Sequence, residues 1–282
     1  VAEKIAAEMQ QHNGIITTDD LKNYQAVWRE PIKGTYKNYT IISMPPPSSG
    51  GIALMQLLNM MENYPLKKWG FHSVNSVSIM TEAEKRVYAD RATWLGDPDF
   101  TKVPKNELIS KSYSASRMQN VDTNTVTPAA QIKAGTFTGY ESEETTHFSI
   151  VDKYGNAVSI TTTLNDSYGS RIIVNGCGFI LNNEMDDFSA KPGEPNLYGL
   201  IGGEANAIAP GKRMLSSMTP TIVEKDGQLF MVVGTPGGST IITSVFQNII
   251  NVIEFDMTMQ EAVDAPRFHN QWLPDEIKIE ND

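Results

Sequence analysis

The sequence predicts a mixed α/β or α+β fold in which layers of helix and strand pack together. Its 282 residues are 40% apolar, enough to bury the core of one large domain or of two small ones. Helical periodicity dominates the N-terminal part and returns near the C-terminal end, whereas alternating patterns typical of strands follow residue 145. Strand runs with helices at either end favour stacked layers.

The first helix is expected in "VAEKIAAEMQ" at the start of the chain. Val1, Ile5 and Met9 fall on one face of it, and Asn13-Gly14 supplies a stop signal. These features predict a short amphipathic helix.

Two longer helices are expected after the stiff turn "MPPPSSGG". Ser48 and Ser49 are placed to cap the apolar segment "IALMQLLNMM", which is typical of a buried helix. A second helix is predicted over 77–95 and is closed by "GDPDF". Its helically spaced positions are Met80, Ala83, Val87, Arg91 and Trp94.

Residues 97–144 are polar, weakly periodic and rich in Ser, Thr, Asn and Lys, which predicts an exposed connector. Strand patterns follow in "THFSIVD", "AVSITTTL", "TPTIVEK" and "LFMVVG". The segment "STIITSVFQNIINVIEF" then returns to helix. Its apolar face consists of Ile242, Val245, Phe246, Ile249, Ile250 and Ile253.

Composition and charge exclude several classes of function. The net charge is −10 and no basic stripe is visible, which argues against nucleic-acid binding. Cys177 is the only cysteine, so neither an internal disulfide nor a Cys-based zinc cluster is possible. The histidines at 12, 72, 147 and 269 are scattered, and we expect no metal site and no cofactor.

Targeting signals give little information, because both ends of the sequence look cut. The chain starts without Met inside a helical pattern and stops inside an alternating one. No signal peptide is visible, and no run approaches the roughly 18 apolar residues of a membrane helix.

The stretch "TTHFSIVDKYGNAVSITTTLN" alternates like two strands joined by a turn at "KYGN". Thr145 begins the polar face of the first strand, and Thr163 and Asn165 lie on the polar face of the second. Matching these faces requires a turn with an odd number of residues. This register sets Thr145 opposite Thr163 or Asn165, whereas an even turn would oppose it to Leu164.

Thr145 has two interpretations. Threonine is a good strand residue, and for most Thr-rich hairpins that explanation suffices. However, Thr145 follows a polar connector and opens the strand, where cleavage of the preceding bond would make it N-terminal. An N-terminal threonine carries its own base, because its α-amino group titrates near pH 7.7–8.0 and can take the hydroxyl proton.

The same stretch resembles the start of the small subunit of the gamma-glutamyltransferases (gamma-glutamyltranspeptidases), which are N-terminal-nucleophile hydrolases. "MPPPSSGG", "AEKRVYADRATWLGDPDF", "LNNEMDDFSAKPG", "NAIAPGKRMLSSMTPTIV", "GTPGGS" and "APRFHNQWLPDE" also resemble family segments, in family order. The resemblance implies an αββα sandwich, incomplete in this chain. It implies that 1–144 is the C-terminal part of the large subunit and that 145–282 is the small catalytic subunit, cut short at its C-terminus.

The resemblance also assigns catalytic roles. Thr145 matches the nucleophile, freed by cleavage of the Glu144–Thr145 bond, and Thr163 matches a threonine that hydrogen-bonds it. Gly237 and Gly238 match the oxyanion hole, where bare backbone N–H groups can approach an oxyanion. The layout of "GTPGGS" between a strand and a helix is similar to that of a phosphate-binding loop, but no Gly-Lys-Ser/Thr follows it, which argues against a P-loop.

Substrate-binding roles follow in the same way. By resemblance, Asn165, Glu184 and Asp187 hold the α-amino group of the substrate, and Asn165 also helps to hold its α-carboxylate, to which Ser216 and Ser217 donate. From spacing alone, a solvated turn is favoured for the acids, because they lack the spacing of a calcium-binding loop. For the two serines, the alternative is a turn or a helix cap, where adjacent serines are common. Tyr198 resembles a lid tyrosine found in part of the family, and a plain surface aromatic is the alternative.

The implied activity is cleavage of the γ-glutamyl amide of glutathione, with transfer to water or to an amino-acid or peptide acceptor. The implied partners are the two subunits of one precursor, and the implied location is periplasmic or extracellular. The alternatives are a related acylase (cephalosporin acylase or poly-γ-glutamate-processing type) and an inactive homologue that binds without catalysis. One departure is that the family arginine that clamps the α-carboxylate precedes the region matching Val1.

Overall fold

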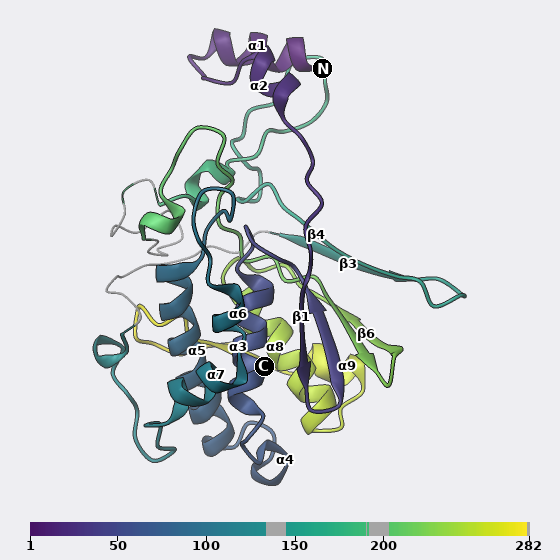
Figure 1. The fold of residues 1–282 in the computed structure, drawn as a ribbon. Coiled ribbons are helices and arrows are strands. Elements are labelled where there is room, and N and C mark those ends of the chain that lie inside the picture. The colour runs from purple at the N-terminus through teal and green to yellow at the C-terminus, as the bar shows by residue number, and fades with distance from the viewer. Residues whose placement is uncertain (134–144, 190, 192–202, 281–282) are drawn as a thin grey trace.

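The structure is a computed structural model that describes residues 1–133, 145–189, 191 and 203–280. Helices lie against one face of an antiparallel sheet, and a separate hairpin projects from the body (Figure 1). The chain is therefore a layered mixture of helix and sheet, as the sequence predicted.

The central sheet joins the two parts of the chain. Its order is β1-β2-β5-β6, all antiparallel, and β2 pairs with β5 so that Ile41 lies opposite Val223. The sequence patterns had indicated β5 and β6 but not β1 and β2. The strand bounds are β1 Ile32–Tyr36, β2 Tyr39–Ser43, β5 Thr221–Lys225 and β6 Gln228–Val233.

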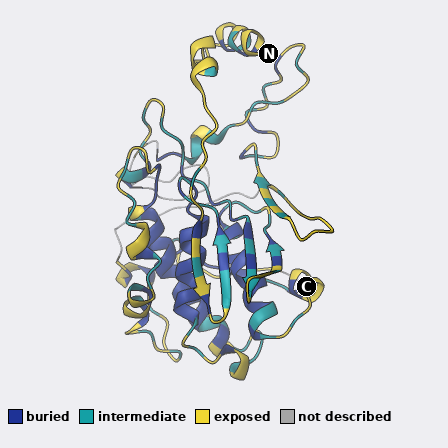
Figure 2. Ribbon diagram, turned by 45° about the vertical axis from the view of Figure 1, so that its right-hand side comes forward, coloured by how far each residue is buried: buried dark blue, intermediate teal, exposed yellow. Residues whose placement is uncertain are grey.

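The helices enclose the core on one side of this sheet, and the long central ones are buried along most of their length (Figure 2). Helix α3 packs against β1, α5, α7 and α8, so it lies at the centre of the helical layer. The bounds are α3 Gly50–Met61, α4 Leu66–Trp69, α5 Val74–Trp94, α6 Lys105–Leu108, α7 Lys111–Met118, α8 Thr240–Glu254 and α9 Met259–Asp264. The predicted helices over 77–95 and 239–255 are confirmed within a few residues.

The N-terminal helices stand apart from this core (Figure 1). Helix α1 (Ala2–Gln11) buries Ile5 and Met9 as predicted, but Val1 precedes the helix and is 76% exposed, so its place on the apolar face was wrong. Helix α2 (Thr18–Asn23) begins with a capping box between Thr17 and Asp20.

The predicted capping of α3 is wrong for Ser49, whereas Ser48 does bind the first amide of the helix. Ser49 takes the N-cap position without a side-chain cap bond, and its Oγ donates instead to the Ser216 carbonyl at 2.7 Å. Ser48 Oγ does accept the Gly50 N–H at 3.2 Å, but it donates to Met218 at 2.7 Å. The serines hold the turn against the segment before β5, because that segment offers carbonyl groups that the sheet does not pair.

The expected connector, residues 97–144, is partly built into the body. It forms α6 and α7 and buries Leu108, Met118, Ala129 and Ile132. The prediction of an exposed segment was therefore wrong for this part, because a few spaced apolar side chains suffice to dock a short helix. Residues 134–144 lie outside the described residues.

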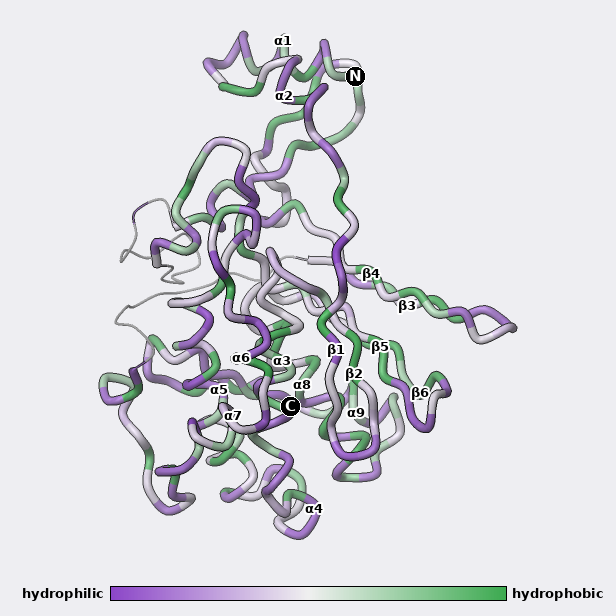
Figure 3. The backbone as a smooth tube through the Cα atoms, viewed as in Figure 1, coloured by the Kyte–Doolittle hydropathy of each residue, from purple (hydrophilic) through white to green (hydrophobic). Residues whose placement is uncertain are grey.

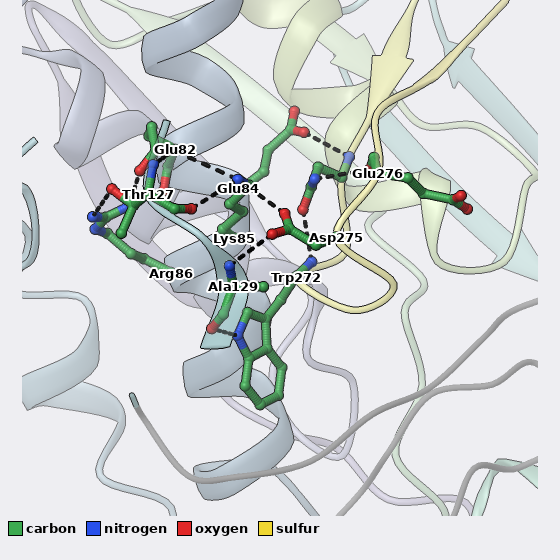
Figure 4. A network of polar contacts seen from close by, with 10 residues as sticks. Glu82, Glu84, Lys85, Arg86, Thr127, Ala129, Trp272, Asp275 and Glu276 are labelled. Carbon is green, nitrogen blue, oxygen red and sulfur yellow. Dashed lines mark hydrogen bonds and ion pairs between the residues drawn. The ribbon is translucent and has the colours of Figure 1, made fainter. Parts of the chain in front are cut away.

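A polar network on α5 holds residues 127–129 of this segment (Figure 4). Glu82 accepts the Thr127 N–H at 3.0 Å, and Lys85 donates to the Thr127 carbonyl at 3.0 Å. Asp275, from the C-terminal part, pairs with Lys85 at 3.0 Å and accepts the Ala129 N–H at 2.8 Å. The network thus ties α5, the approach to residue 145 and the C-terminal segment together.

The hairpin of β3 (Thr146–Val151) and β4 (Ala157–Thr162) extends away from the sheet, with green apolar stretches along both strands (Figure 3). Phe148, Ile150 and Val158 are 43%, 56% and 44% exposed. A second small pair is formed by β7 (Phe268–His269) and β8 (Lys278–Ile279). No helix in the described part of the chain has the length and apolar character needed to cross a membrane.

Candidate active site

Thr145 immediately precedes β3, and the hairpin register determines its neighbour. Thr146 pairs with Thr162 and Val151 with Ala157, so five residues, 152–156, form the turn. The predicted odd turn is confirmed, and the register continues to place Thr145 opposite Thr163. Both line one cavity of about 220 Å³ at the base of the hairpin.

Gly237 and Gly238 lie in the loop between β6 and α8. Their φ angles are +126° and +52°, which favour glycine, and the Gly237 carbonyl accepts the Thr240 N–H at 2.9 Å. Among the described residues, neither amide N–H of this glycine pair has a hydrogen-bond partner. Gly237 and Thr145 line the same cavity of about 440 Å³, so the candidate nucleophile and the candidate oxyanion loop border one space.

Asn165 links the hairpin to the acidic turn. Its N–H donates to Thr163 Oγ1 at 2.8 Å, and its side-chain amide donates to the Asn183 carbonyl at 3.3 Å. Asn183 Oδ1 in turn accepts the Asp166 N–H at 2.9 Å. Asn165 has a φ of +77° and is 8% exposed, so its side chain is held where the hairpin ends.

The acidic turn is a single 3₁₀ turn, η2 (Glu184–Asp187). Burial, the carboxylate of Glu184 and that of Asp186 raise the pKa of Asp187 and Arg91 lowers it, so that together they bring it to about 7. Burial also raises the pKa of Glu184. A carboxyl with this raised pKa gains most from a bound cation, because the cation restores its charged form. This is more than a solvated turn, the alternative that spacing alone favoured.

Ser216 and Ser217 lie before β5, pressed against the turn that precedes α3. Ser48 and Ser216 form an isolated parallel bridge, and Ser49 N–H donates to the Ser216 carbonyl at 2.7 Å. A Cβ on Gly50 would lie 2.3 Å from the Met218 carbonyl oxygen, so this close approach requires glycine. The serines are therefore held by backbone contacts as well as by side chains.

Two residues that the sequence patterns did not indicate join the acids to the serines. Asn206, 4% exposed, donates to the Asp187 carbonyl at 2.7 Å and accepts the Leu215 N–H at 2.9 Å. Arg91, on α5, donates to Ser217 Oγ at 3.0 Å. Both residues lie within segments that carry the family resemblance, but neither had a pattern that marked it as functional.

The predicted residues thus form two groups. The first consists of Thr145, Thr163, Gly237 and Gly238, and the second consists of Glu184, Asp187, Ser216 and Ser217. Asn165 connects them through Asn183, and the contacts of the described residues do not bring Ser217 directly to Thr145. Glu144 and Tyr198 lie outside the described residues.

The described residues offer hydroxyls, backbone amides and carboxylates. Within residues 1–133, 145–189 and 203–280, no group of three or more His, Cys, Asp or Glu side chains is arranged to hold a metal ion. A hydroxyl facing free amides suits attack on a carbonyl carbon, and adjacent acids suit an ammonium group. This combination is typical of amide cleavage in substrates with an amino-acid head.

Comparison with known proteins agrees with this geometry. A family model described as Gamma-glutamyltranspeptidase matches residues 1–282. The chain belongs to the gamma-glutamyltranspeptidase family. A glutathione hydrolase proenzyme of Escherichia coli (strain K12) is 55% identical over 280 residues, which cover 99% of this chain and 48% of the relative.

More distant relatives of this chain include acylases. Acylase ACY 1 proenzyme of Pseudomonas sp. (strain SE83) is 40% identical, over 92% of this chain and 44% of the relative. The crystal structure of cephalosporin acylase from Bacillus halodurans aligns with a TM-score of 0.78 at 26% identity, over 95% of this chain and 45% of that one. The predicted N-terminal-nucleophile fold is confirmed, and the chain spans about half the length of the curated relatives it matches.

Proposed function

We propose that the complete protein is a self-processing threonine enzyme that cleaves the γ-glutamyl amide of glutathione and related compounds. The observation that carries this proposal is the position of Thr145, which immediately precedes β3 and lines one cavity with Thr163 and another with Gly237. Membership of the gamma-glutamyltranspeptidase family supports the substrate class.

Self-cleavage comes first. Thr145 Oγ attacks the carbonyl carbon of Glu144, the C–N bond breaks, and the acyl group moves from nitrogen to oxygen as an ester. Water hydrolyses the ester, which leaves a carboxylate on Glu144 and a free α-amino group on Thr145. The processed protein then consists of a large subunit that ends at 144 and a small subunit that starts at 145. The sheet β1-β2-β5-β6, to which both subunits contribute strands, holds them together.

Turnover uses the freed amino group as base. It takes the Thr145 hydroxyl proton as Oγ attacks the γ-carbonyl carbon of the donor. The N–H groups of Gly237 and Gly238 stabilise the tetrahedral oxyanion. The departing amine takes the proton, and water or an acceptor amine then attacks the γ-glutamyl ester, which completes hydrolysis or transfer.

Recognition of the γ-glutamyl head uses the second group of residues. Asp187 and Glu184 hold the α-ammonium, because charge-assisted bonds to carboxylates suit a permanent cation. Ser216 and Ser217 donate to the α-carboxylate, and Asn165 holds both groups of the head from the base of the hairpin. Tyr198 is proposed to cover the bound donor.

The deciding experiment uses the full-length precursor. N-terminal sequencing after incubation is expected to give Thr-Thr-His-Phe-Ser for the smaller fragment, and the processed protein is expected to hydrolyse a γ-glutamyl anilide. A precursor that stays intact under these conditions would favour an inactive homologue that binds without catalysis.

A second candidate is an acylase, favoured by the 40% identity to acylase ACY 1 proenzyme. A glutaryl anilide is a suitable comparison substrate, because it has the chain of a γ-glutamyl anilide without the α-amino group. Rates on γ-glutamyl anilide and glutaryl anilide separate the two candidates: the acidic turn predicts preference for the γ-glutamyl donor, and the reverse preference would support the acylase.

We also propose that the full-length protein works in the periplasm or outside the cell, on the strength of the family resemblance alone. Fractionation of the source cells, followed by detection of the small subunit, tests this location.

A further inference from the structure

Arg91 is a buried cation whose contacts include the hydroxyl groups of two serines. It is 4% exposed near the end of α5, and it donates from Nε to Ser49 Oγ at 2.9 Å and from Nη2 to Ser217 Oγ at 3.0 Å. A guanidinium group has donors and no acceptor. Both serine oxygens therefore accept from Arg91, and each must direct its own hydrogen elsewhere.

The hydrogen of Ser49 has an identified destination. Ser49 Oγ donates to the Ser216 carbonyl at 2.7 Å, so a chain of donors runs from Arg91 through Ser49 to the backbone of Ser216. Because Ser217 Oγ also accepts from Arg91, its own hydroxyl hydrogen must point away from the guanidinium group. Arg91 thus orients the Ser217 hydroxyl as a donor and, through Ser49, holds the backbone of Ser216.

Arg91 also contributes charge to the same region. It lowers the pKa of Asp187, against the effects of burial and of the carboxylates of Glu184 and Asp186. A carboxylate group brought to Ser217 would approach the Arg91 guanidinium, while an ammonium would approach Asp187. This arrangement of charges matches the two ends of an amino-acid head.

We propose that Arg91 is a positioning residue for the α-carboxylate of the donor, acting through Ser217 and through the Ser49–Ser216 contact. The inference rests on the proposed function. An ionised carboxylate accepts hydrogen bonds and has no hydrogen to donate. Ser217 must therefore donate its hydroxyl hydrogen to the α-carboxylate of the substrate.

The test compares two donors on the processed full-length protein. The first is a γ-glutamyl anilide, and the second is the 4-aminobutyryl anilide, which keeps the ammonium but lacks the α-carboxylate. Arg91→Gln is expected to raise KM for the γ-glutamyl anilide by about 10- to 100-fold. KM for the second donor should change by less than about threefold, and kcat should change little for either, as expected when ground-state binding is lost.

Further variants separate positioning from simple structural damage. Arg91→Lys keeps the charge but cannot reach both serines in a fork, so its KM for the γ-glutamyl anilide should fall between wild type and Arg91→Gln. Ser217→Ala combined with Arg91→Gln should be within about twofold of Ser217→Ala alone, since Arg91 acts through Ser217.

Arg117→Gln is the matched control. Arg117 is another largely buried cation, on α7, and it pairs with Asp90 at 3.2 Å. This variant is expected to lose stability without changing the ratio of KM values between the two donors. An equal loss on both donors in Arg91→Gln, or no loss, would overturn the inference, and so would wild-type behaviour of Arg91→Lys on both.

Calorimetric binding of L-glutamate and of 4-aminobutyrate keeps the inference separate from the proposed function. If wild type shows no γ-glutamyl turnover, the proposed function fails. Loss of glutamate binding alone in Arg91→Gln would still support the role of Arg91, and a wild type that binds no glutamate would overturn both.

Discussion

The two ends of the candidate site differ in the chemical groups that form them. The reaction end, around Thr145, consists of neutral hydroxyls and backbone amides at the base of a hairpin whose strands are largely exposed. The recognition end, around Asp187 and Ser217, contains carboxyl groups with raised pKa values and the buried Arg91.

This difference predicts which kinds of mutation and which changes of pH should affect each end. The reaction end depends on register and on backbone conformation, so small changes of geometry should act there on kcat. The recognition end depends on compensating charges, so changes of charge or of pH should act there on KM and on stability. The following predictions test that division, from the largest expected effect to the smallest.

Thr145→Ala in the full-length precursor is expected to abolish both self-cleavage and turnover, because both use the same hydroxyl. Thr145→Ser should keep part of each. Mass analysis for the small subunit and the γ-glutamyl anilide assay measure the two effects. Cleavage before residue 145 in Thr145→Ala would remove Thr145 from the reaction end.

Gly237→Ala should lower kcat by about 100-fold while KM changes little. Gly237 has a φ of +126°, which strains any residue with a Cβ, and a Cβ there would also lie 2.4 Å from Thr240 Oγ1, so relief of this strain is expected to move the N–H groups of the loop. Gly155→Ala is the matched control: its φ is +86°, but nothing lies within 4 Å of the added Cβ. Similar losses of kcat in both variants would contradict the assignment.

Asp187→Ala should raise KM for γ-glutamyl donors by about 10- to 100-fold and leave self-cleavage intact. The reason is the loss of a charge-assisted bond to the substrate ammonium. Asp186→Ala removes a neighbouring acid of the same turn and should change KM by less than about threefold. Unchanged kinetics in Asp187→Ala would move the ammonium site elsewhere.

The pKa of about 7 for Asp187 predicts that donor binding weakens in acid. Below that pH the carboxyl is protonated in the free enzyme, and it must lose the proton to pair with an ammonium. KM for the γ-glutamyl anilide should therefore rise by up to about tenfold between pH 8 and pH 6. A flat KM over this range would show that another group holds the ammonium.

The Asp187 carboxyl also affects the stability of the fold, but acid, which weakens donor binding, increases stability. Because its folded pKa is raised from 3.8 to about 7, the folded state binds the proton more tightly, and stability is lost as pH rises through this interval. The loss from this group is on the order of 2–4 kcal/mol. Urea unfolding at pH 5 and pH 8 should show a smaller decrease for Asp187→Asn than for wild type, and equal decreases would refute the prediction.

The sequence predicted the helices and strands in which apolar residues recur with one regular spacing. The helix over 240–254 and the strands β3 to β6 each show a clear periodicity, and the structure confirms them. Strands β1 and β2 were missed, since Gly34 lies within one and "YKNY" joins them without a strong turn signal. Residues 105–118 were missed as helices because short segments take their stability from packing rather than from their own sequence.

The sequence alone limited the neighbour of Thr145 to Thr163 or Asn165. Side chains alternate along a strand, so matching the polar faces allows only an odd turn, and the five-residue turn in the structure then selects Thr163. Only the tertiary structure decided the surroundings of Ser217. Arg91 is 126 residues away from it along the chain, and no local period relates them. Their contact depends on how α5 packs beside the segment before β5, which is a property of the folded core as a whole.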